Sequence, residues 1–220
     1  MQNISGAILA GGKATRLGGI EKGLLKIKGE TIIEHTLRML EPLVDEVFII
    51  TNDSKPYSFL NIPIFPDKML GLGPLQGIAT ALSQSSYKRT LIVPCDMPFI
   101  TEPSIQTLIN YDQEAEAIIP RSQKGFEPLF AIYSISCLPK ILEILRCKKR
   151  KVIDIIPKIK ASFVPSDFFE DSLWCNINNL DDLDKIKAYL SRPNKKECCF
   201  ELTKYKFSLQ NGDSTPFCTE

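Results

Sequence analysis

The feature that most constrains the fold is an alternation between short, continuously apolar runs and segments with the periodicity of an amphipathic helix. The run at residues 7–10 leads into a glycine-rich loop, and the run at 91–93 ends in Pro-Cys-Asp-Met-Pro. Strands that are apolar on both faces are typical of a parallel sheet with helices on both sides. We therefore expect a three-layer α/β/α fold with a mainly parallel sheet.

Local signals place the individual elements. Thr31 and Glu34 form a capping box that predicts a helix ending at about residue 41, before Pro42. Apolar residues at helical spacing predict a second helix directly after Pro74. The remaining expected elements are strands at 47–51, 117–120, 129–133 and near residue 163, and helices at 136–145 and 180–190.

Composition excludes several classes of protein. The 220 residues carry 27 Lys and Arg against 26 Asp and Glu, a net charge of +1. A nucleic-acid or anionic-membrane binder usually has a basic excess, so we expect neither partner. The apolar runs are far shorter than the ~20 residues that a membrane-spanning helix needs.

Cysteine usage indicates a reducing compartment. The seven cysteines are scattered without a Cys-x-x-Cys pair, and His35 is the single histidine, which argues against a zinc site and a disulfide framework. Free thiols and the absence of a recognisable leader lead us to expect a cytoplasmic protein. We interpret Cys95 as a packed side chain, because no histidine is placed to activate it. Residues 1–191 are expected to form a single domain, and residues 192–220 a C-terminal tail to which the sequence assigns no role.

The glycine-rich segment at residues 9–19 is the first candidate binding site. It follows a strand, and open α/β sheets bind ligands beyond the carboxyl ends of their strands. Gly11 and Gly12 allow the backbone to approach a phosphate closely, while Arg16 and Lys22 would supply positive charge. A flexible turn with surface cations explains the same residues when they are considered alone.

Three further motifs could carry chemistry. Asp96 follows a buried strand between two prolines and is a candidate Mg²⁺ ligand, although it could also cap a turn. Residues 73–74 begin a helix whose N-terminus either faces a ligand or simply ends a turn. Asn176 and Asn178 share one face of a short predicted strand and could complete a metal shell; helix capping by Asn178 or Asn179 explains them as well.

The order and spacing of these motifs resemble those of nucleotidyltransferases that activate phosphorylated metabolites. Segments 73–77, 94–98, 127–133 and 176–178 narrow the resemblance to the molybdenum cofactor guanylyltransferases, over about residues 5–190. The resemblance implies a Rossmann-like nucleotidyltransferase fold with a mixed sheet. It implies transfer of GMP from GTP to molybdenum-bound molybdopterin with release of pyrophosphate. Its implied partners are GTP, molybdopterin, other cofactor-assembly proteins and acceptor molybdoenzymes.

The resemblance also implies roles for individual residues. The catalytic group is Arg16, Lys22 and Asp96, with Asp96 holding Mg²⁺; the nucleotide would be contacted by Leu9, Ala10, Gly11, Gly12, Lys22, Asp67 and Asp96, and by either Thr51 or Asn52. Gln76 departs from the pattern, because the family has a small residue at that place. The alternatives are a nucleotidyltransferase with another nucleotide or a sugar-phosphate substrate, and a nucleotide-binding assembly protein without turnover.

Overall fold

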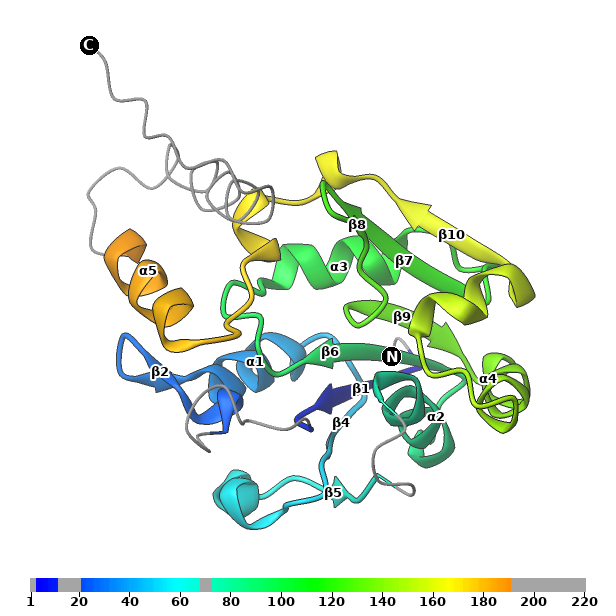
Figure 1. The fold of residues 1–220 in the computed structure, drawn as a ribbon, viewed down its shortest axis with the longest axis horizontal. Helices are drawn as coiled ribbons and strands as arrows, with labels where there is room; N and C mark the ends of the chain where they lie inside the picture. The colour runs from blue at the N-terminus through cyan, green and yellow to red at the C-terminus, as the bar shows by residue number, and fades with distance from the viewer. Residues whose placement is uncertain (1–2, 12–20, 68–72, 191–220) are drawn as a thin grey trace.

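The computed structural model describes residues 3–11, 21–67 and 73–190. Gly12, Arg16 and the predicted tail at 192–220 therefore lie outside the described residues. Helices flank both faces of one central sheet, giving three layers (Figure 1). The three-layer α/β/α fold expected from the apolar runs is confirmed.

The central sheet is mixed and mostly parallel. Over the described ranges its strand order is β10-β7-β9-β6-β1-β4-β5, with β8 paired to β7 off this path. The strands are β1 (Ile4–Leu9), β4 (Glu46–Ile50), β5 (Ile64–Phe65), β6 (Arg89–Pro94), β7 (Ala117–Ser122), β8 (Gly125–Phe126), β9 (Ala131–Ser134) and β10 (Ala161–Val164). β1 is parallel to both β4 and β6, whereas β9 is antiparallel to its neighbours β6 and β7.

Two pairs of helices cover the sheet. α1 (Ile32–Leu40) and α3 (Glu102–Asn110) pack on one face, and α2 (Pro74–Gln84) and α4 (Cys137–Arg146) on the other (Figure 1). α5 (Leu180–Leu190) contributes to a smaller apolar cluster that it shares with the start of α1. The smaller elements are the hairpin β2 (Lys26–Ile27) and β3 (Glu30–Thr31), and the 3-10 helices η2 (Lys22–Leu24), η3 (Lys55–Leu60), η4 (Val152–Lys158), η5 (Ser166–Phe168) and η6 (Asp171–Trp174).

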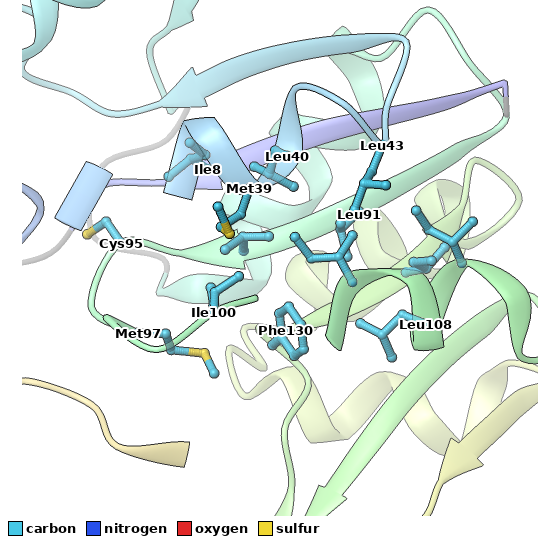
Figure 2. Packing of buried hydrophobic residues seen from close by; sticks show 14 of the residues in the cluster. Ile8, Met39, Leu40, Leu43, Leu91, Cys95, Met97, Ile100, Leu108 and Phe130 are labelled. Carbon is cyan, nitrogen blue, oxygen red and sulfur yellow. The ribbon is translucent and has the colours of Figure 1, made fainter. Parts of the chain in front are cut away.

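The sheet is apolar on both faces because each face has its own core. In β1, Ile8 belongs to the core beneath α1 and α3, while Ala7 belongs to the core beneath α2 and α4. Leu91 and Ile92 of β6 divide in the same way. Figure 2 shows the first core, where Ile8 and Leu91 lie near Leu40 of α1. Successive strand residues point to opposite faces, so a strand buried on both sides reads as an unbroken apolar run.

Most predicted elements are confirmed, and the exceptions are instructive. The predicted capping box begins α1: the Thr31 hydroxyl accepts from the Glu34 N–H at 3.3 Å, and the Glu34 carboxylate accepts from the Thr31 N–H at 2.9 Å. The strand predicted at residues 176–178 is wrong, because this segment is irregular. No helix in the described part of the chain is long and apolar enough to cross a membrane.

Candidate active site

The carboxyl ends of four parallel strands meet at one edge of the sheet. β1, β4, β5 and β6 end there, and the residues just beyond them include Gly11, Thr51, Asp67 and Asp96. The chain adds β4 and β5 on one side of β1 and then returns to place β6 on the other. Such a reversal of strand order opens a crevice in which α/β sheets bind ligands.

A lysine at this edge joins three segments that are distant in sequence. Lys22 Nζ lies 2.9 Å from Asp96 Oδ2 and 3.2 Å from Asn178 Oδ1. The two charged side chains are 27% and 20% exposed, so the ion pair is mostly buried and keeps some contact with solvent. The Ile177 N–H donates to the Asp96 carbonyl at 3.0 Å and fastens the Asn178 segment to the end of β6. The structure thus brings together Lys22, Asp96 and Asn178.

Close packing beneath the lysine explains its position. A Cβ on Gly23 would lie 3.3 Å from the Tyr57 hydroxyl, a tight contact, and 3.5 Å from Cys95 Cβ, so η2 packs closely against both residues. The Tyr57 hydroxyl in turn donates to the Glu21 carboxylate at 3.3 Å. These contacts hold the backbone on either side of Lys22 against the core.

Cys95 belongs to this packing rather than to the chemistry. It is 8% exposed and lies in the core beneath α1 (Figure 2). Burial raises the pKa of the Cys95 thiol to about 12, and the neighbouring Asp96 charge acts in the same direction. The thiolate is the nucleophilic form of cysteine, so this side chain is inert at neutral pH. The interpretation of Cys95 as a packed side chain is confirmed.

The asparagine segment is held by the cap of α5. Asn179 Oδ1 accepts from the Asp182 N–H at 2.8 Å, and the Asp182 carboxylate accepts from the Asn178 N–H at 2.9 Å. Asn179 is therefore the N-cap, which leaves the Asn178 side chain for Lys22. Asn176 Oδ1 is buried and has no hydrogen-bond partner in the described part of the chain.

The oxygen atoms around Lys22 suit a divalent cation. Asp96 and Asn178 direct one oxygen each at the same positive charge, the Lys22 ammonium. Within residues 3–11, 21–67 and 73–190, no group of three or more His, Cys, Asp or Glu side chains could hold a metal by itself. Mg²⁺ binds through one or two carboxylates together with water and substrate phosphate oxygens, and this donor set fits that pattern.

Part of the backbone expected to contact the nucleotide is already bonded within the sheet. The Ala10 N–H donates to the Ile50 carbonyl at 3.0 Å, and the Leu9 carbonyl accepts from the Cys95 N–H at 3.2 Å. Gly11 lies beyond this ladder, and a Cβ there would meet no described atom within 4 Å. Among the described residues, nothing packs against Gly11 at the place of a side chain.

The structure distinguishes the two candidates beyond β4. The Thr51 N–H donates to the Phe65 carbonyl, and the Thr51 hydroxyl bonds to the backbone of Asp53 at 3.3 Å. Thr51 is buried, whereas Asn52 is exposed. Asn52 is therefore the residue whose side chain is accessible at the site.

Asp67 is joined by hydrogen bonds to the first turns of α2. The Thr80 hydroxyl donates to Asp67 Oδ1 at 2.8 Å, and Gln76 Nε2 donates to the Thr80 hydroxyl at 3.3 Å. Gly73 caps the helix with φ +78°, a conformation in which any other residue would be strained. The helix start thus holds Asp67 at the edge of the sheet.

Glu127 is a candidate residue to which the sequence assigned no role. It belongs to the predicted 127–133 motif, and its carboxylate accepts from the Ser122 hydroxyl at 2.6 Å. Burial raises the pKa of Glu127, and the negative charge of Asp96 raises it further. Glu127 is thus a half-buried carboxylate held by the Ser122 hydroxyl. Its only signal in the sequence is the motif that contains it.

Comparisons with known proteins identify the family. The family model described as "MobA-like NTP transferase domain" matches residues 6–159 of this chain. The chain is 32% identical over 196 residues to the "Probable molybdenum cofactor guanylyltransferase" of Carboxydothermus hydrogenoformans, covering 87% of this chain and 98% of the relative. It is 33% identical to the molybdenum cofactor guanylyltransferase of Pasteurella multocida, covering 81% of this chain and 96% of the relative.

A solved structure has the same fold. The molybdopterin-guanine dinucleotide biosynthesis protein A of Archaeoglobus fulgidus superposes with a TM-score of 0.71 at 24% identity, covering 85% of this chain and 98% of that protein. The strand reversal and the Lys22–Asp96 pair thus occur in a fold of nucleotidyltransferase type. From the extent of these matches, the chain belongs to the MobA-like NTP transferases and, among them, to the molybdenum cofactor guanylyltransferases.

Proposed function

We propose that this chain transfers GMP from GTP to molybdenum-bound molybdopterin and releases pyrophosphate. An oxygen of the pterin's terminal phosphate attacks the α-phosphorus of GTP, and the bond from that phosphorus to the pyrophosphate oxygen breaks. The attacking oxygen is already an anion, so the reaction needs neither a side-chain base nor a covalent intermediate. The main barrier is the repulsion between two polyanions and the charge that develops on pyrophosphate.

The observation that carries the proposal is the position of Lys22 between Asp96 and Asn178, where the strand order reverses. In this proposal Lys22 neutralises phosphate oxygens of the bound nucleotide. Asp96 and Asn178 would hold Mg²⁺, which when bound supplies Lewis-acid neutralisation of the phosphates. Arg16, outside the described residues, remains a predicted second cation.

The nucleotide is proposed to follow the edge of the sheet. Gly11 would allow close approach of the phosphates, and Asn52 and Asp67 would contact the nucleoside end. The other substrate would approach from the side of Asn178 and Glu127. Positioning of two reactants is itself a large part of catalysis in such a reaction.

The direct test is turnover with a nucleotide panel. Purified chain, Mg²⁺ and molybdenum-bound molybdopterin are incubated with GTP, CTP, ATP or UTP, and pyrophosphate release is followed together with the dinucleotide product. We expect turnover with GTP and a rate at least about 10-fold lower with the others, by loss of one or more base-specific hydrogen bonds. A preference for CTP would favour the cytidylyl alternative. Binding of GTP without turnover would favour a non-catalytic assembly protein.

Lys22→Ala tests the role of the lysine. We expect it to weaken GTP binding and turnover together, because the cation contacts phosphate in both the ground state and the transition state. Lys187→Ala, an exposed lysine on α5, is the matched control. Unchanged kinetics for Lys22→Ala would contradict the assignment of this edge of the sheet as the nucleotide site.

The substrates also define the expected setting of the enzyme. GTP and molybdopterin are its proposed partners, with other cofactor-assembly proteins and acceptor molybdoenzymes as the proposed source and destination of the cofactor. We propose that it works in the cytoplasm. The free thiols of Cys95, Cys137, Cys147 and Cys175 support a reducing compartment.

A further inference from the structure

Gln76 is a buried polar residue whose hydrogen-bonding capacity is incompletely used. It is 5% exposed and lies in the first turn of α2. Its Nε2 donates to the Thr80 hydroxyl, but its Oε1 has no hydrogen-bond partner among the described residues. An unpaired buried acceptor is costly, and native proteins usually satisfy such groups with protein, water or ligand.

The hydrogen-bond network decides which end of the Gln76 amide lacks a partner. A threonine hydroxyl has a single proton, and a carboxylate can only accept. The Thr80 hydroxyl therefore donates to the Asp67 carboxylate at 2.8 Å, and its oxygen must accept from the Gln76 amide at 3.3 Å. The Gln76 amide nitrogen must therefore face Thr80, and the Gln76 carbonyl oxygen is the atom without a described hydrogen-bond partner. The missing partner must be a donor.

This requirement separates the two ends of a nucleotide. Ionised phosphate oxygens only accept hydrogen bonds, so a triphosphate cannot satisfy Gln76 Oε1. The base and the ribose carry N–H and O–H donors. Asp67 lies two hydrogen bonds away through Thr80 and is likewise an acceptor. Gln76 Oε1 and the Asp67 carboxylate, which are linked through Thr80, are thus both acceptors, while Lys22 provides a cation beside the end of β6.

We propose that Gln76 accepts a hydrogen bond from the nucleoside part of the bound nucleotide and, through Thr80, orients Asp67 toward the same part. The inference rests on the proposed function, because it takes GTP as the ligand. It assigns Gln76 as a specificity-determining contact and Thr80 as a positioning residue. The triphosphate then extends from α2 toward Lys22.

The test compares ligands in Gln76→Met, which retains side-chain volume and removes both hydrogen-bonding groups. Calorimetry measures the affinity for GTP, ITP, 2′-deoxy-GTP and inorganic pyrophosphate. We expect the GTP affinity to fall by about 10-fold or more, the usual effect of losing a buried hydrogen bond to a ligand. The pyrophosphate affinity should be unchanged, because it has no nucleoside. Gln84→Met, at the other end of α2, is the control.

The analogues identify the donor. ITP lacks the 2-amino group of guanine, so an ITP affinity that is insensitive to Gln76→Met would assign the contact to that group. If instead the affinity for 2′-deoxy-GTP does not change in Gln76→Met, the donor to Gln76 is the ribose 2′-hydroxyl. An equal fall for all three nucleotides, with pyrophosphate unchanged, would assign it to a donor that they share. Each of these outcomes supports a nucleoside contact.

Two further readouts separate binding from structural damage. In turnover assays Gln76→Met should raise the KM for GTP more than it lowers kcat, since the contact is remote from the reacting phosphorus. Thr80→Val should weaken GTP binding without altering pyrophosphate binding, whereas Thr80→Ser, which keeps the hydroxyl, should restore it. Circular dichroism checks that each variant is folded.

The refuting outcomes are distinct. GTP affinity within twofold of the wild type in Gln76→Met would overturn the inference and leave buried water as the partner of Oε1. An equal loss of GTP and pyrophosphate binding would overturn it as well, because it would indicate general distortion of the site. If the wild-type chain failed to bind GTP at all, the proposed function itself would be refuted.

Discussion

Asp96→Asn separates the electrostatic role of this side chain from its structural role. The amide has the same shape and keeps an oxygen that can accept from Lys22, now 2.9 Å from Asp96 Oδ2. It loses the negative charge that a divalent cation requires. We therefore expect an intact fold and a large loss of metal-dependent turnover.

The two expected magnitudes differ enough to be distinguished. The ion pair is partly exposed to solvent, where such pairs contribute about 0.2–1 kcal/mol, and the amide keeps a hydrogen bond from the Lys22 ammonium. The substitution should therefore lower the free energy of unfolding by at most about 1 kcal/mol. For a chain of this size that lowers the Tm by about 2–4 °C. Loss of charge stabilisation in phosphoryl transfer is expected to lower kcat by at least about 10³-fold, or about 4 kcal/mol.

The assay combines pyrophosphate release at saturating GTP and Mg²⁺ with thermal unfolding of the same preparations. Asp167→Asn, which removes an exposed carboxylate on η5, is the control for a charge change elsewhere. Turnover of Asp96→Asn within 10-fold of the wild type would refute the assignment of Asp96 as the carboxylate that holds the metal. A Tm drop well beyond 4 °C would show that Asp96 serves the fold more than the reaction.

Three further predictions concern other parts of the molecule. Thr31→Ala removes the side chain that caps α1 and should lower the free energy of unfolding by about 1 kcal/mol, measured by urea denaturation. Cys95→Ser should retain turnover, because the thiol is buried with its pKa raised to about 12; complete loss of activity in a folded variant would contradict this. Hydrogen bonds from Lys140, Lys160 and Ser136 lower the pKa of Glu116 from 4.5 to about 2, so its stabilising effect is present above pH 4.5 and is lost as the pH falls toward 2. Glu116→Gln should therefore flatten the fall of unfolding free energy between pH 4.5 and 2, and an unchanged slope would contradict the assignment.

Elements with a local cause could be predicted from sequence. The Thr31–Glu34 capping box and the helix after Pro74 depend on residues within one or two turns, and both were located correctly. α3 had a comparable signal, since Thr101 and Ser104 cap it reciprocally, but the serine does not match the usual Glu or Gln of a capping box. The Asn176–Asn178 segment was misassigned because alternation over three residues fits both a strand and an irregular chain.

The site was predictable only one segment at a time. Lys22, Asp96 and Asn178 were each candidates, but the spacing of 74 residues between the first two says nothing about their separation in space. The choice of Asn178 over Asn176 as the partner of Lys22 depends on the Ile177–Asp96 hydrogen bond and the cap of α5. The Gln76–Thr80–Asp67 relay likewise joins two elements across the edge of the sheet.

The amino-acid sequence alone determined the class of the fold and the chemistry available to it. Continuous apolar strands need cover on both faces, and glycine, lysine and aspartate after strand ends supply groups for phosphate and metal. Tertiary structure alone decided that β9 runs antiparallel between β6 and β7, and that one lysine ammonium lies between Asp96 and Asn178. The physical reason is range: propensity and capping act within a few residues, whereas strand pairing and ion pairs join groups whose proximity results from packing the whole core.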